Sequence, residues 1–443
     1  MALMHEHTPL PAALAATLVD KAREFGIPGL AISLVAPGRH SVFTTGVEAP
    51  GSERPVTANT WFSVASLGKH VTACAVLDLA QAGALDLEAP IGRYLTDLPA
   101  AWSQRPVLSL LRHTSGLPEY LAYTESETVP ERRDAFMRTY GGMATAFEPD
   151  EGWIYTNTNY ILLGFLIAQL AGRPYAAVVQ SLFDRVGCVG ATVASPQWTR
   201  DANAQGLGST GRDEASARRE VIGDGDISFT AQGALTWLQA LLSHRLLSTA
   251  SITTMFTPAP LRTARPSPYG CGWFVDTLRG APIGHHAGHY DGWTAMAVLS
   301  PTQDCGVVAM CNLAPRNTRA IRYLAQFALE SFVPGSTPLS LHPITDDSPA
   351  LTARIKAQLF RDGTALDENC FADELLHVVA HGSEVRNVIN LWTGVEPLAF
   401  DLVEQQRHAT HCLRRYRIRY PERVEHLLVG TTPQDKIYWA WPL

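Results

Sequence analysis

The sequence has no apolar run long enough to cross a membrane, and it carries little charge for its length. No segment of its 443 residues approaches the roughly 20 consecutive apolar residues that a membrane-spanning helix needs, which excludes an integral membrane protein. Charged residues make up 17% of the chain and hydrophobic residues 46%. A mostly disordered chain would combine low hydrophobicity with high net charge. The composition therefore predicts a soluble globular protein with a sizeable core.

Excess positive charge and paired cysteines are also missing. The formal net charge is -7, so the chain has no general attraction for polyanions, and we expect no nucleic-acid partner. The seven cysteines are an odd number without a C-x-x-C pair, which indicates neither a disulfide framework nor a thiolate zinc site. The first 20 residues lack the basic region and the continuous apolar stretch of a signal peptide. We therefore expect a cytoplasmic protein that does not bind membranes.

Hydrophobic periodicity predicts a helix followed by antiparallel strands, which is an α+β beginning. Apolar residues at helical spacing mark three helices, at about 10–24, 66–83 and 159–171. Five other segments are typical of strands, namely 30–36, 40–47, 268–279, 293–300 and 305–312. Since these strands come from both ends of one region, we expect them to meet in a single sheet with helices between.

A segment rich in proline, serine and aspartate, residues 333–349, has the composition of a linker. We therefore predict two domains, at 1–335 and 345–443. The second contains the alternating run 413–420, in which Tyr416 and its neighbours on one face alternate with Arg415 and its neighbours on the other. This alternation predicts one packed and one solvated sheet face, and an anion-binding or subunit-contact surface is the alternative.

Ser66 and Lys69 open the second predicted helix as an S-x-x-K motif. Residues three apart lie on one helical face, so the hydroxyl would sit beside the ammonium group. The helix N-terminus adds partial positive charge and free N–H groups, which favour an activated nucleophile and a nearby oxyanion. The alternative is a capping serine with an ordinary surface lysine, because the motif also occurs by chance.

Two further short motifs carry groups that suit acyl chemistry. Tyr155 and Asn157 precede a helix, where a phenol near a lysine can exchange a proton and an amide can hold a carbonyl. His286 and Gly288 lead into a strand, where a glycine lets a substrate backbone approach. The structural alternatives are a half-buried tyrosine and a turn asparagine. Glycines interrupt this segment, so its histidines do not lie on a regular helix, and no acidic residue stands at the spacing of a metal site. We therefore expect no metal ion.

Together and in this order, S-x-x-K, Y-x-N and H-x-G resemble the signature elements of the serine β-lactamase and penicillin-binding-protein-like hydrolases. Three longer segments are similar to the same family: LLRHTSGLPEY (110–120), the predicted helix and its flanks at 155–175, and GDISFTAQGALTW (225–237). The resemblance covers about residues 10–330. Within the family, the H-x-G form is typical of esterases and D-aminopeptidase-like members.

The resemblance implies a role for each catalytic residue. Ser66 would be the acylated nucleophile, Lys69 its activating partner, and Tyr155 the general base that later acts as the acid. No cofactor is implied.

The resemblance also implies the groups that bind the substrate. Asn157 would hold its amide or carbonyl, and His286 and Gly288 would line the third strand. The backbone N–H groups of Ser66 and His289 would form the oxyanion hole.

The fold that the resemblance implies is an α/β (α+β) sandwich. It has a five-stranded antiparallel sheet flanked by helices, with an all-helical insertion at about 85–225. The C-terminal residues lie outside the resemblance, and we expect a small α+β or β-rich accessory domain there.

The third motif begins with His286, where β-lactamases and transpeptidases usually have a lysine. A histidine with a pKa near 6.5 is mostly neutral at pH 7 and attracts a substrate carboxylate weakly. We therefore predict a hydrolase for a small ester, amide or D-residue peptide, with β-lactam hydrolysis as a side activity at most. Asp224 and Asp226 lie close to the expected cleft, where a carboxylate could bind a substrate ammonium group; turn aspartates are the alternative.

Two other functions remain open at this stage. The same acyl-enzyme could pass its acyl group to an amine or alcohol, which would make an acyltransferase or a peptide-cyclising enzyme. A catalytically silent binding protein is the other alternative, although the serine, lysine and tyrosine are all present. The sequence predicts neither the oligomeric state nor the stereochemistry of the substrate.

Overall fold

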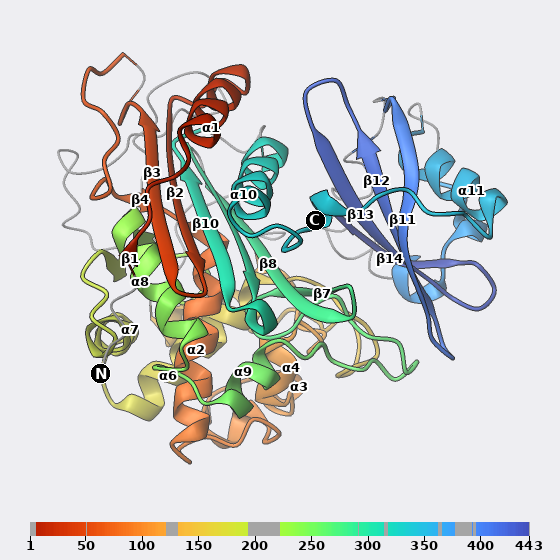
Figure 1. Ribbon diagram of the computed structural model, residues 1–443. Coiled ribbons are helices and arrows are strands. Elements are labelled where there is room, and N and C mark those ends of the chain that lie inside the picture. Colours follow the sequence, from red (N-terminus) through yellow and green to blue (C-terminus); the bar gives the residue numbers. More distant parts are fainter. Residues whose placement is uncertain are drawn as a thin grey trace.

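Two separate sheets organise the chain, a large one with helices on both faces and a smaller one at the C-terminal end (Figure 1). The computed structural model describes residues 6–49, 51–120, 132–193, 222–290, 292–313, 318–361, 366–376, 392 and 396–442. The mixed α/β sandwich expected from the sequence is confirmed.

The large sheet joins strands from both ends of the first region, in the order β1-β3-β2-β10-β9-β8-β7. Every neighbouring pair is antiparallel except β1 with β3. The early hairpin meets the late strands where β2 pairs with β10, as predicted. The strands are β1 (Glu6–His7), β2 (Gly29–Ala36), β3 (Arg39–Gly46), β7 (Phe274–Leu278), β8 (Ala281–Tyr290), β9 (Trp293–Ser300) and β10 (Cys305–Cys311).

The sheet has seven strands where the sequence predicted five, and the main difference is β8. This strand contains the whole H-x-G segment, although the glycines of that segment had suggested an interruption of regular structure. Both glycines are places where another part of the chain packs directly on the strand. A Cβ at Gly284 would overlap the ring of Phe256, and one at Gly288 would overlap the carbonyl of Val64. Glycine in a strand therefore marks close approach here, rather than a break.

Helices cover both faces of the large sheet (Figure 1). One face packs on α1 (Ala12–Glu24) and α10 (Thr318–Phe332), whose buried residues share a core with β2 and β10. The other face carries α2 (Lys69–Gln81) and α8 (Ala231–Leu242). The remaining helices of this region are α3 (Ala100–Ser103), α4 (Val107–Leu111), α5 (Arg133–Tyr140), α6 (Asn157–Ala171), α7 (Tyr175–Arg185) and α9 (Thr249–Met255).

A third, very short sheet supports the start of α2. Its order is β4-β6-β5, and its strands are β4 (Phe62–Ser63), β5 (Ala191–Val193) and β6 (Ile227–Phe229). Among the residues that the structure describes, no single helix is long and apolar enough to span a membrane, although α6 and α7, bent by 79°, pass that test as a pair.

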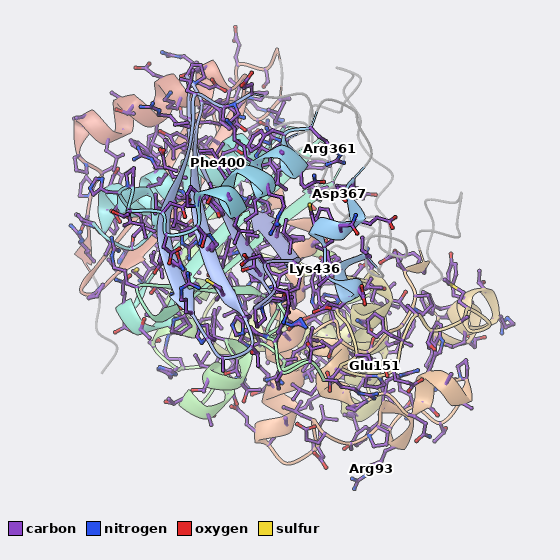
Figure 2. All side chains as sticks on the ribbon, turned by 90° about the vertical axis from the view of Figure 1, so that its right-hand side faces the viewer. Arg93, Glu151, Arg361, Asp367, Phe400 and Lys436 are labelled. Atoms are coloured by element: carbon purple, nitrogen blue, oxygen red, sulfur yellow. The ribbon has the colours of Figure 1, made fainter. Side chains whose placement is uncertain are left out.

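Among its described residues, the C-terminal part contains an 11-residue α-helix and four antiparallel strands in the order β11-β12-β13-β14. Figure 2 views the molecule from this side, with Phe400 of β11 and Lys436, just before β14, labelled. The elements are α11 (Pro349–Leu359), β11 (Ala399–Arg407), β12 (Cys412–Arg419), β13 (Val424–Thr431) and β14 (Ile437–Pro442).

The arginine face of β12 differs from its prediction. Arg415 is only 1% exposed and forms ion pairs of 2.7 Å with Asp276 of β7 and 2.9 Å with Glu404. It also donates a hydrogen bond to the carbonyl of Thr277. At this position the face is neither solvated nor an anion site, because it packs against the first region and its charge is balanced there.

Candidate active site

Ser66 lies on a single 3-10 turn, Ala65–Gly68, that runs directly into α2. Ala65 has a φ of 46°, a left-handed conformation that is uncommon for a residue other than glycine. The turn is held from outside, since the N–H of Val64 donates to the carbonyl of Ile227 at 3.1 Å. The nucleophile predicted from the sequence therefore sits on a strained turn that the short sheet and β8 both support.

Lys69 is the centre of the site. Its side chain is fully buried, and its Nζ lies 3.1 Å from Ser66 Oγ, 2.7 Å from Asn157 Oδ1 and 2.6 Å from the carbonyl of Asp224. These partners come from three separate segments of the chain. The structure therefore brings the S-x-x-K and Y-x-N motifs within hydrogen-bonding distance of one ammonium group.

Tyr155 completes this convergence through its ring. Lys69 Nζ lies 5.0 Å from the centroid of the Tyr155 ring and 5.8 Å from that of Tyr160, within the range of a cation–π contact. Asn157 is the first residue of α6, and its N–H donates to Glu119 at 2.6 Å. The ring of Tyr155 therefore lies beside the same ammonium group that contacts Ser66, and the catalytic role of its hydroxyl stays a prediction.

His113, to which the sequence assigned no role, supports the Tyr155 segment. Its Nδ1 accepts a hydrogen bond from the N–H of Thr156 at 3.2 Å, and its carbonyl accepts one from Ile154 at 3.1 Å. Its ring lies 4.5 Å from that of Tyr155. Burial and the nearby Lys69 lower the pKa of His113 well below its usual value, so the ring is neutral and its proton is on Nε2. The LLRHTSGLPEY segment contained the signal, but the chain alone does not show that His113 reaches Tyr155.

His286 is also buried and neutral. Its Nε2 lies 2.9 Å from the hydroxyl of Tyr269, and its ring centroid lies 6.0 Å from that of Tyr155. Burial and Lys69 lower the pKa of His286 well below 6.5. The sequence predicted a mostly neutral histidine here. Because it is buried, His286 carries even less positive charge at neutral pH than an exposed histidine would.

Gly288 contacts the nucleophile turn itself. The sequence predicted that this glycine makes room for a substrate, whereas the room is occupied by the backbone of Val64 and Leu67. β7 pairs with residues 281–285 of β8, and no strand of the described residues pairs with the same edge of residues 286–290. The side chain of His289 is exposed on that half. The binding roles of Gly288 and His289 stay predictions.

Asp224 and Asp226 are buried in the wall behind Lys69. Asp224 binds the ammonium through its backbone carbonyl. Burial, with the neighbouring Asp224, raises the pKa of Asp226 to about 8, so this carboxyl holds its proton at neutral pH. The ammonium-binding role considered for these residues needs an accessible carboxylate, and neither side chain is accessible.

The three histidines of the third motif do not gather at one point. Successive residues of a strand point to opposite faces, so His286 faces the nucleophile turn while His285 and His289 face the other side of the sheet. Within the described ranges, no group of three or more metal-ligating side chains is close enough to hold an ion.

The chain belongs to the beta-lactamase family, whose model matches residues 14–329. Penicillin-binding protein 4* of Bacillus subtilis (strain 168) is 29% identical over 274 residues, which are 56% of this chain and 59% of that protein. A D-aminopeptidase of Gluconobacter oxydans (strain 621H) is 25% identical over 300 residues, or 64% of this chain and 56% of that protein. The matches thus span less than two thirds of the length of these curated relatives. The family resemblance inferred from the three motifs is confirmed.

Solved structures agree on the fold. The D-amino acid amidase from Ochrobactrum anthropi SV3 aligns with a TM-score of 0.61 and 23% identity, covering 72% of this chain and 99% of that one. A beta-lactamase/D-alanine carboxypeptidase from Pseudomonas syringae aligns with a TM-score of 0.62 and 18% identity, covering 72% and 98%. The C-terminal strands β11 to β14 lie outside the family match.

Proposed function

We propose that this protein is a serine hydrolase that cleaves an ester or amide bond through an acyl-enzyme on Ser66. The observation that carries the proposal is the position of Lys69, whose Nζ contacts Ser66 Oγ and Asn157 Oδ1 and faces the ring of Tyr155. A buried amine beside a serine and a phenol provides both an activated nucleophile and a route for its proton.

The reaction runs in two halves. For this the Tyr155–Lys69 pair must start with one proton fewer than a phenol and an ammonium together. In the first half, Ser66 Oγ attacks the carbonyl carbon while its proton passes to this pair, and that proton then leaves with the departing alcohol or amine as the old bond breaks. In the second, water attacks the acyl-enzyme and gives its proton to the same pair, which returns it to Ser66 Oγ as the ester bond breaks and the acid leaves. The N–H groups of Ser66 and His289 would stabilise the negative oxygen in both halves.

The neutral His286 narrows the substrate class. Since no lysine stands at this position, the site offers little attraction for a carboxylate next to the scissile bond. A small ester, an amide or a D-residue peptide fits better than a β-lactam. The names of two similar proteins, a D-aminopeptidase and a D-amino acid amidase, support an amide of a D-amino acid.

Labelling with a fluorophosphonate tests the proposal. Intact-mass spectrometry should show one adduct on the wild-type protein and none on Ser66→Ala. Ser63→Ala, altered three residues earlier in β4, is the matched control and should be labelled normally. Equal labelling of wild type and Ser66→Ala would show that the nucleophile is a different residue.

Turnover of a substrate panel then tests the finer assignment. D- and L-aminoacyl amides, p-nitrophenyl esters and nitrocefin should be compared, and we expect the esters or D-amides to be turned over fastest. Strong nitrocefin turnover would contradict the role given to His286. Product analysis with an added amine separates hydrolysis from acyl transfer.

A further inference from the structure

An aromatic side chain of the last strand reaches the wall of the candidate active site. Trp441 of β14 stacks on Phe274 of β7, with ring centroids 4.1 Å apart and planes inclined by 18°. It also meets the ring of Trp153 edge-on at 5.9 Å. Trp153 lies two residues before Tyr155, so the C-terminal strand touches the segment that carries Tyr155.

Phe274 also contacts two residues of the proposed active site, Tyr155 and His286. Its ring is nearly parallel to that of Tyr155, at 6.2 Å and 7°, and lies 5.4 Å from the ring of His286. It also packs edge-on against Tyr269, whose hydroxyl bonds His286. Phe274 is buried, as are Tyr155 and Trp153, so the orientation of these rings is set by their neighbours rather than by solvent.

The strand that carries Phe274 is also held by charge. Asp276 of β7 pairs with Arg415 of β12 at 2.7 Å, and both side chains are almost completely buried. A second pair between the two regions, Arg265 with Glu374, measures 2.7 Å. Both ion pairs hold the C-terminal region against the region that carries Phe274.

We propose that Trp441 is a positioning residue for the reaction, which fixes Phe274 and through it the ring of Tyr155. The C-terminal sheet is then part of the working active site, although it lies outside the family match. The inference rests on the proposed function, in which Tyr155 moves the proton of Ser66. Small displacements of a reacting group are costly, since about 1 Å can reduce a rate by roughly 100-fold.

The test compares three variants by their rate of Ser66 labelling with a fluorophosphonate. Trp441→Leu removes the stacked ring and should slow labelling by about tenfold. Trp441→Phe keeps an aromatic ring stacked on Phe274, and its labelling rate should be within about twofold of wild type. Phe400→Leu is the control: it removes a ring from the same sheet, where Phe400 packs against Phe360 and Tyr416, and should leave the labelling rate within about twofold of wild type.

A double-mutant cycle separates positioning from a general loss of stability. Tyr155→Phe alone should slow labelling by about 100-fold or more. In that background, Trp441→Leu should change the rate by less than about twofold, because the group it positions is gone. The same tenfold loss with or without the Tyr155 hydroxyl would overturn the inference, as would an unchanged rate in Trp441→Leu alone. An unchanged rate in Tyr155→Phe would overturn the role of Tyr155 itself, which is a distinct result.

Discussion

At the scale of single residues, ionisation in this site is controlled by burial. His113 and His286 lose their charge in the buried wall around Lys69, and Asp226 keeps its proton at neutral pH. Lys69, in contrast, has oxygen partners from three segments around its Nζ. Three oxygen atoms therefore surround one ammonium group, while the nearby His113, His286 and Asp226 are neutral.

The buried Asp226 predicts a stability that falls as pH rises. Its pKa is about 8 in the folded protein against 3.8 in an exposed carboxyl, so between these values the unfolded chain ionises and the folded protein does not. We expect Asp226→Asn to be more stable than wild type at pH 7.5, by on the order of 5 kcal/mol, with the difference vanishing near pH 4. Urea unfolding at both pH values measures this.

Asp134 provides a control of opposite sign. Hydrogen bonds from Arg132 and Arg138 lower the pKa of Asp134 to about 2, so its carboxylate contributes stability above pH 4 that is lost as the pH falls toward 2. Asp134→Asn should therefore be less stable than wild type at neutral pH. A pH-independent gap for Asp226→Asn would show that Asp226 is ionised in the folded protein.

At the scale of elements, the nucleophile turn depends on its contact with β8. The turn Ala65–Gly68 crosses this strand at Gly288, where no side chain fits. The same turn is bonded to β6 through Val64 and Ile227. The four-residue turn is therefore packed between β8 of the large sheet and β6 of the short sheet. These contacts hold Ala65 in its left-handed conformation.

Gly288→Ala tests this contact. The added methyl group overlaps the carbonyl of Val64, so the turn must shift. We expect fluorophosphonate labelling of Ser66 to slow by more than about tenfold. Gly142→Ala is the control, because a Cβ there meets nothing within 4 Å. Labelling of Gly288→Ala at the wild-type rate would mean that the turn tolerates displacement.

At the scale of the whole molecule, the two regions are joined by buried charge as well as by aromatic stacking. The Arg415–Asp276 pair is almost fully enclosed, with exposures of 1% and 3%. Breaking a buried pair leaves one charge without its partner, whereas an exposed pair contributes little.

We therefore expect Arg415→Met to destabilise the protein by about 3–5 kcal/mol. The double variant Arg415→Met with Asp276→Leu should recover part of this loss, since the more deeply buried of the two carboxylates that Arg415 pairs with is removed. Arg407→Met breaks an exposed pair with Asp347 and should change the stability far less than Arg415→Met does. Chemical unfolding of the four proteins measures these differences. Equal losses for Arg415→Met and Arg407→Met would contradict a structural role for the buried pair.

The sequence by itself determined the family, the α/β sandwich and the positions of several central helices and strands. The predicted segments 30–36, 293–300 and 305–312 correspond to β2, β9 and β10, because hydrophobic periodicity is a local property of the chain. Only tertiary structure decided that the H-x-G segment is itself a strand and that Arg415 is buried. It also decided that His113 supports Tyr155 and that Trp441 reaches Phe274. These features depend on which surfaces meet across hundreds of residues, and burial, ionisation and close approach are properties of that contact rather than of any short stretch of sequence.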